Sequence, residues 1–189
     1  MPSPDDTLSS SEQAQLRFLT GVCGTPPRLE RFGPADDGVA VATFEGYPNT
    51  DARTHVTVGL ARHPFSLHRR RPVGYELAAS VPADAPSFAP VLAGAVLENL
   101  RLVRSRERRP FIEANGVYAP GYPPHLLFTT EVTATPAFAG RHLFSDRYVY
   151  FLSTVPLDDA ELRLYDRDVR ALLTQLNAGD RIAGVSRAD

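Results

Sequence analysis

Two titratable residues in apolar surroundings are the first candidates for chemistry in this chain. His55 stands in the run Thr-His-Val-Thr-Val at positions 54–58, and Glu76 stands in Gly-Tyr-Glu-Leu at 74–77. A histidine and a carboxylate that came together could provide the general base of a small enzyme. An unpaired buried carboxylate is costly, however. We therefore favour a structural interpretation of both: His55 as a half-buried neighbour in a sheet, and Glu76 as a carboxylate satisfied by an arginine or by backbone N–H groups.

The other reactive side chains lack the spacing that a known chemistry requires. The five histidines include no i,i+4 pair and no HExxH pattern, although His63 and His68 share one loop and could meet a third metal ligand. Neither Gly-x-Ser-x-Gly nor a glycine-rich phosphate loop occurs. Cys23 follows a predicted helix, whose dipole raises the pKa of a thiol at that end. We therefore predict no catalytic residue, no metal and no cofactor.

Composition narrows the classes of partner. All 20 basic residues are arginine, 22 residues are acidic, and the net charge is −2. Binding to nucleic acid in general needs a strong positive field, so nucleic acid is not an expected partner. The N-terminus has neither a basic region nor an apolar run, and no segment has the length of a membrane span. With one cysteine and no internal disulfide, we expect a cytoplasmic protein without membrane contact.

Hydrophobic periodicity predicts the elements that must position these residues. A capping box of Ser9 and Glu12 begins a short helix that ends near Gly21. Alternating side chains predict strands over 38–44, 54–60, 73–81 and 126–132. A mostly apolar run predicts a further strand over 148–155, in the interior of the sheet. Apolar residues at helical spacing predict two long helices, one after Ser87 and one after a capping box of Asp158 and Glu161.

This order of elements lacks the regular strand and helix alternation of a parallel sheet. The sequence therefore predicts an α+β fold: a mainly antiparallel sheet of about five or more strands, with two long packing helices and a short N-terminal helix. Residues 1–8 are expected to form a flexible arm, and residues 9–189 a single domain. A chain of this length is large enough to bury a core of its own.

Three segments resemble a Suppressor-of-fused (SUFU) domain: Thr-Val-Gly-Leu at 57–60, Glu-Leu at 76–77 and Val-Pro-Leu at 155–157. As an order of segments, the resemblance extends over nearly the whole chain. Many relatives have serine after Gly-Leu where this chain has Ala61, and the tryptophans common in the family are missing. The resemblance implies a SUFU-like domain with a structural motif of Thr57, Gly59, Glu76, Pro156 and Glu161. Gly59 would lie within an interior strand, at a bulge or beside a closely packed helix.

The resemblance also implies a function. Many bacterial single-domain relatives are thought to be immunity proteins, and none is a recognised enzyme. We expect a non-enzymatic protein-binding domain, an immunity protein that neutralises a cognate toxin of a bacterial polymorphic toxin system; the alternative is a small enzyme of unrecognised type that uses His55 and Glu76. Arginine and tyrosine are enriched at interface hot spots, so we predict the partner surface in the loops 62–72 and 110–124. Its anchors would be Arg69, Arg70, Arg71, Tyr118 and Tyr122.

Overall fold

The computed structural model describes residues 8–33, 38–62, 73–104, 111–113, 122–123, 125–130, 132, 135–145 and 147–178. This part of the chain contains four α-helices and eight β-strands, which confirms the predicted α+β class. None of the helices in it is long and apolar enough to cross a membrane.

One sheet contains all the described strands: β1 (Arg28–Phe32), β2 (Val39–Glu45), β3 (Ala52–Val58), β4 (Val73–Pro82), β5 (Phe111–Glu113), β6 (His125–Thr129), β7 (His142–Phe144) and β8 (Arg147–Leu157). Their order is β1-β2-β3-β4-β8-β6-β5, and β7 pairs with β8 outside this path. β1 to β4 form an antiparallel meander. β4 and β8 are parallel, whereas β8 is antiparallel to β6 and β7, so the sheet is mainly antiparallel as predicted.

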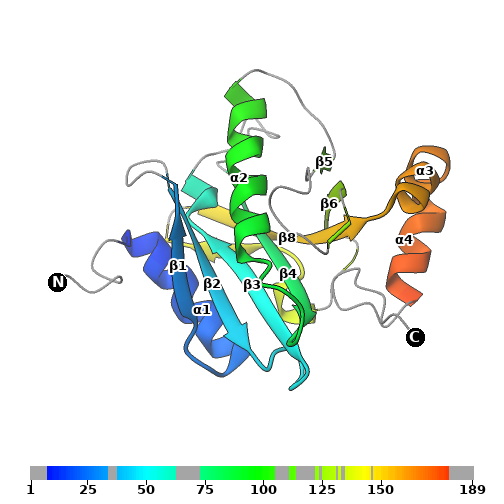
Figure 1. Ribbon diagram of the computed structural model, residues 1–189. Helices are drawn as coiled ribbons and strands as arrows, with labels where there is room; N and C mark the ends of the chain where they lie inside the picture. The colour runs from blue at the N-terminus through cyan, green and yellow to red at the C-terminus, as the bar shows by residue number, and fades with distance from the viewer. Residues whose placement is uncertain are drawn as a thin grey trace.

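Two helices, α1 (Ser10–Cys23) and α2 (Ala89–Arg104), lie on opposite faces of this sheet (Figure 1). Side chains alternate between the faces along each strand, so neighbours in sequence belong to different cores. In β2, Val39 and Val41 pack into the core beneath α2, whereas Ala40 and Ala42 pack into the core on the α1 side. The sheet is therefore apolar on both faces over the meander.

The predicted N-terminal helix is confirmed together with its capping box. Ser9 Oγ accepts a hydrogen bond from Glu12 N at 3.3 Å, and Glu12 Oε2 accepts one from Ser9 N at 2.7 Å. The helix ends at Cys23, slightly later than the sequence indicates, where Gly24 takes the left-handed conformation (φ 75°) and donates its N–H to Thr20 O. Burial raises the pKa of the Cys23 thiol to about 12, so desolvation produces the rise that we predicted from the helix dipole.

The second long helix of the prediction is two helices, α3 (Asp159–Arg167) and α4 (Val169–Ala178). Asp158 caps α3 as predicted: its Oδ1 accepts from Glu161 N, and Glu161 Oε2 accepts from Asp158 N. Asp168 interrupts the helical run because its carboxylate accepts hydrogen bonds from Arg170 N and Ala171 N, which begins a new helix. Both helices pack against β6 and β8 in a third core.

The strands of the meander lie where the sequence indicates, with one shift. The predicted strand 54–60 begins at Ala52 and ends at Val58, and a short 3-10 turn, η2 (Leu60–Arg62), follows it. β1, β5 and β7 are not predicted, since they are short and β1 is rich in charge. Residues 1–7 lie outside the described part, so the flexible arm stays a prediction; Leu8, its last residue, is buried.

Candidate functional site

The carboxylate of Glu76 is fully buried in β4 and accepts five hydrogen bonds from described residues. Three come from the backbone N–H groups of residues 59–61, at 3.0, 3.3 and 3.0 Å. The others come from Thr57 Oγ1 at 2.6 Å and from Gln15 Nε2 of α1 at 3.1 Å. Burial raises the pKa of Glu76 to about 7, and hydrogen bonds, foremost that of Thr57, oppose the rise. The side chain thus holds η2 and α1 against β4, and backbone N–H groups satisfy it, as the structural interpretation requires.

Gly59 lies just after β3, so its assignment to an interior strand is wrong. Its φ of +103° belongs to a region that L side chains rarely adopt, and the chain turns there into η2. This turn aims the backbone N–H groups of residues 59–61 at Glu76, which an extended strand could not do. A Cβ at Gly59 would collide with Glu12 Oε1 of α1. The other part of the prediction, a closely packed helix, is therefore confirmed.

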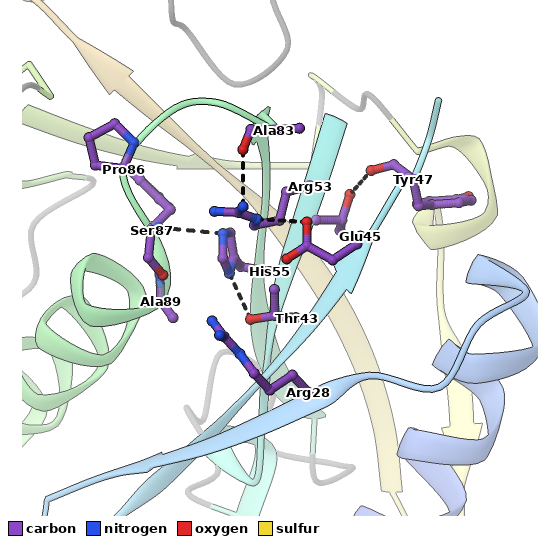
Figure 2. A network of polar contacts seen from close by, with 12 residues as sticks. Arg28, Thr43, Glu45, Tyr47, Arg53, His55, Ala83, Pro86, Ser87 and Ala89 are labelled. Carbon is purple, nitrogen blue, oxygen red and sulfur yellow. Dashed lines mark hydrogen bonds and ion pairs between the residues drawn. The ribbon is translucent and has the colours of Figure 1, made fainter. Parts of the chain in front are cut away.

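His55 is fully buried on β3 beside the start of α2, whereas the sequence predicts a half-buried side chain (Figure 2). Its Nε2 accepts a hydrogen bond from Phe88 N at 3.4 Å, and its Nδ1 lies 3.0 Å from Thr43 Oγ1 of β2. A ring nitrogen that accepts carries no proton, so Nδ1 holds the proton of the neutral ring and donates it to Thr43. The first N–H groups of a helix have no acceptor within the helix. The imidazole of His55 provides an acceptor for one such donor at the start of α2.

Burial foremost, and then the positive charges of Arg53 and Arg28, lower the pKa of His55 to about 3. Arg53 is held beside the ring, because its Nε donates to Glu45 Oε2 at 2.9 Å and its Nη2 donates to Ala83 O at 3.0 Å (Figure 2). An imidazole with so low a pKa is neutral near pH 7 and is a poor general base there.

The two candidates for chemistry do not form one site. His55 contacts β2 and the start of α2, whereas Glu76 contacts α1 and η2 on the other side of the sheet. Their polar atoms are engaged by the fold, so the enzyme alternative lacks the juxtaposition that it requires. Within the described ranges, no group of three or more His, Cys, Asp and Glu side chains is placed to hold a metal ion.

The remaining predicted residues are dispersed. Pro156 of β8 pairs with Leu126 of β6, and Glu161 completes the cap of α3. Tyr122 is half-buried, its hydroxyl donates to Pro86 O at 2.6 Å, and its ring packs edge-on against Phe88. The structure therefore gives Tyr122 a packing role, while its role as an anchor stays a prediction. The other predicted anchors and the loop histidines lie outside the described residues: Arg69, Arg70, Arg71, Tyr118, His63 and His68.

A surface that the sequence analysis misses lies where β4, β8 and β7 run side by side. Tyr150 of β8 pairs with Tyr75 of β4, and their ring centroids are 6.1 Å apart. In the adjacent row, Tyr148 pairs with Val73 of β4 and with Leu143 of β7. Directly paired residues and residues two apart share one side of a sheet, which here is the α2 side. We call this surface the tyrosine face; it comprises Val73, Tyr75, Arg141, Leu143, Tyr148 and Tyr150.

Comparison with solved structures relates this geometry to known proteins. The chain is similar to the putative SUFU homolog of Neisseria gonorrhoeae FA 1090, with a TM-score of 0.63 and 17% identity over 94% of this chain and 95% of that one. It is similar to a chain of the Sufu–Fu complex (TM-score 0.62, 16% identity, 93% and 89% covered). It is also similar to Drosophila Suppressor of Fused, with a TM-score of 0.60 and 16% identity over 97% of this chain and 52% of that one. No family profile and no curated protein matches the sequence.

These likenesses show that the chain has a SUFU-like fold, as the resemblance of its three segments implies. The chain covers nearly all of the Neisseria homolog and about half of the Drosophila protein. Three residues of the motif, Thr57, Gly59 and Glu76, meet at the turn between β3 and η2.

Proposed function

We propose that this chain is a non-enzymatic protein-binding domain, and more specifically an immunity protein that neutralises a cognate toxin of a bacterial polymorphic toxin system. The tyrosine face carries the proposal. Leu143 on β7 is 60% exposed and pairs with Tyr148, and Tyr75, Tyr148 and Tyr150 are half-buried. Apolar and aromatic side chains gathered on one exposed surface are typical of protein–protein interaction sites.

Two further observations support binding rather than catalysis. The side chains of His55 and Glu76, which an enzyme would use, are engaged by the backbone of the fold. One similar solved structure is that of a Sufu–Fu complex, in which the similar chain is bound to another protein. We propose that this chain also binds a protein. The toxin as the partner follows from the resemblance to bacterial single-domain relatives, and the cytoplasm as the place of binding follows from the single cysteine, which cannot form an internal disulfide. The proposal keeps the earlier anchors as additional contacts: Arg69, Arg70, Arg71, Tyr118 and Tyr122.

The test is co-expression with the products of the adjacent genes. Each product is expressed in a bacterial host, alone and together with the chain. We expect one product that stops growth, growth that is restored when the chain is present, and a complex of the two that elutes as one species in size-exclusion chromatography.

The matched control is an unrelated toxin that has its own immunity protein, which this chain should not suppress. Growth arrest that is the same with and without the chain contradicts the immunity role. A set of neighbours none of which forms a complex with the chain contradicts the binding role as well.

A further inference from the structure

The tyrosine face offers rigid aromatic surface next to the core beneath α2. Leu77 and Leu152, the row that follows Tyr75 and Tyr150, pack into that core. The face is therefore continuous with a packed interior, and its half-buried rings are held by their neighbours in the sheet. Rings that are already ordered lose little conformational entropy when a partner covers them, which favours binding.

Arg141 gives this surface its charge. Its guanidinium carbon lies 4.2 Å from the centroid of the Tyr148 ring, and the residue is exposed. A guanidinium stacked on a ring keeps its N–H donors at the rim of the plane, where a carboxylate can accept two of them at once. None of the six residues of the tyrosine face is acidic.

The positive charge of Arg141 therefore favours a partner that is acidic where it contacts the tyrosine face. A segment that sets a carboxylate against Arg141 gains charge-assisted hydrogen bonds, whereas a basic segment meets like charge. Apolar side chains of the same segment can cover Leu143 and the tyrosine rings. Aromatic platforms also bind single-stranded nucleic acid, but the net charge of −2 gives this chain no field to attract phosphates.

We propose that the tyrosine face binds an acidic polypeptide segment of the protein partner, with a carboxylate against Arg141 and apolar side chains against Leu143 and Tyr150. This inference rests on the proposed function, since it names the surface and the partner chemistry of the same binding event. Its test uses no cognate toxin, so the two can fail separately.

The probe is a random-peptide library displayed on phage and panned against the folded wild-type chain at low salt. We expect enriched peptides to combine Asp or Glu with Leu, Phe or Tyr. A fluorescein-labelled peptide of the enriched sequence should bind in an anisotropy titration, more weakly as salt rises. Arg141→Glu, Leu143→Ser and Tyr150→Ser should each weaken it about tenfold or more, as the loss of a hot-spot residue does.

Val169→Ser is the matched control, because Val169 is 41% exposed on α4, outside the tyrosine face, and its variant should bind like wild type. Arg141 and Leu143 are exposed, so their variants keep the test valid if Tyr150→Ser does not fold. Panning against Arg141→Glu should no longer select acidic residues. The proposal is overturned by peptides without an acidic preference, by an empty selection, by affinities that the three variants leave unchanged, or by displacement of the peptide with a short oligothymidylate.

Discussion

At the scale of single residues, Glu76 shows how one buried carboxylate can join three parts of a chain. Its donors come from α1, from the end of β3 and from η2, which are separate in sequence. A buried acceptor with this many donors is expensive to remove, because each donor is then left without a partner and away from water.

Glu76→Ala should therefore lower the free energy of unfolding by about 3 kcal/mol or more, and Glu76→Gln, which keeps one oxygen acceptor, should cost less. Urea unfolding followed by circular dichroism at neutral pH measures both. The matched control is Glu30→Ala on the edge strand β1, where the carboxylate pairs with Arg28 in solvent and its loss should stay within about 0.5 kcal/mol. Equal losses at positions 76 and 30 would refute the structural role of Glu76.

Gly59 is required at its position for its backbone conformation. Gly59→Ala should destabilise the domain by about 1–3 kcal/mol, because φ is +103° and the new Cβ would displace Glu12. Gly21→Ala is the opposite case, since Gly21 is helical and a Cβ there meets nothing within 4 Å. The free energy of unfolding of this control variant should rise by about 0.5–1 kcal/mol. Thermal melting of the pair decides the matter, and a midpoint for Gly59→Ala at or above that of wild type would exclude the strain.

At the scale of elements, short polar caps decide where the C-terminal helices begin and end. The helical spacing of Leu162, Tyr165, Val169, Leu172 and Leu176 continues past Asp168, so periodicity alone predicts one helix. The carboxylate of Asp168 instead caps a second helix, and the competition between these two effects is not readable from spacing. The box at Asp158 is readable, because both of its members lie within one turn.

Asp158→Ala should remove two hydrogen bonds from the first turn of α3 and lower the free energy of unfolding by about 1 kcal/mol. The control is Asp166→Ala, on an exposed position of the same helix, with an expected change within about 0.5 kcal/mol. Chemical denaturation of both variants gives the comparison. A cost at Asp166 as large as that at Asp158 would show that helix charge, not the cap, is responsible.

At the scale of the whole molecule, the buried neutral His55 makes stability depend on pH. The folded-state pKa is about 3 and the ordinary value is 6.5, so below pH 6.5 the unfolded chain takes up a proton that the folded chain refuses. The contribution of neutral His55 to the free energy of unfolding is fully present above pH 6.5. It is lost as the pH falls toward 3, at up to about 1.4 kcal/mol per pH unit.

His55→Gln keeps a hydrogen-bond acceptor near Phe88 and removes this titration. Wild type should be more stable near neutral pH, and its advantage should shrink as the pH falls from about 6.5 to about 5. Urea unfolding of both proteins across that range measures the difference, in which the other titrating groups cancel. Parallel stability curves would mean that His55 is protonated equally in the folded and unfolded chains.

The sequence predicts the features that depend on neighbours along the chain. The strands around His55 and Glu76 are visible because β2, β3 and β4 alternate, and the need of Glu76 for donors follows from its apolar setting. The identity of those donors does not follow, since the turn at Gly59 is needed to present them. The tyrosine face is hidden because Tyr75 and Tyr150 become neighbours only through the pairing of β4 with β8.

That parallel pairing of β4 with β8 also has a consequence for the order of folding. Neighbouring strands of the meander are joined by connections much shorter than the stretch of chain between Val73 and Tyr148, so the pairing of β4 with β8 has the larger entropic cost. We expect β2 and β3 to be formed in the folding transition state and β8 to join after it. Val56→Ala in β3 should therefore slow refolding, whereas Val149→Ala in β8 should mainly accelerate unfolding, in stopped-flow chevron measurements. If Val149→Ala instead slowed refolding and Val56→Ala did not, the folding nucleus would lie at the β4–β8 junction. If β8 joins after the transition state, as we expect, the tyrosine face is one of the last surfaces of this protein to form.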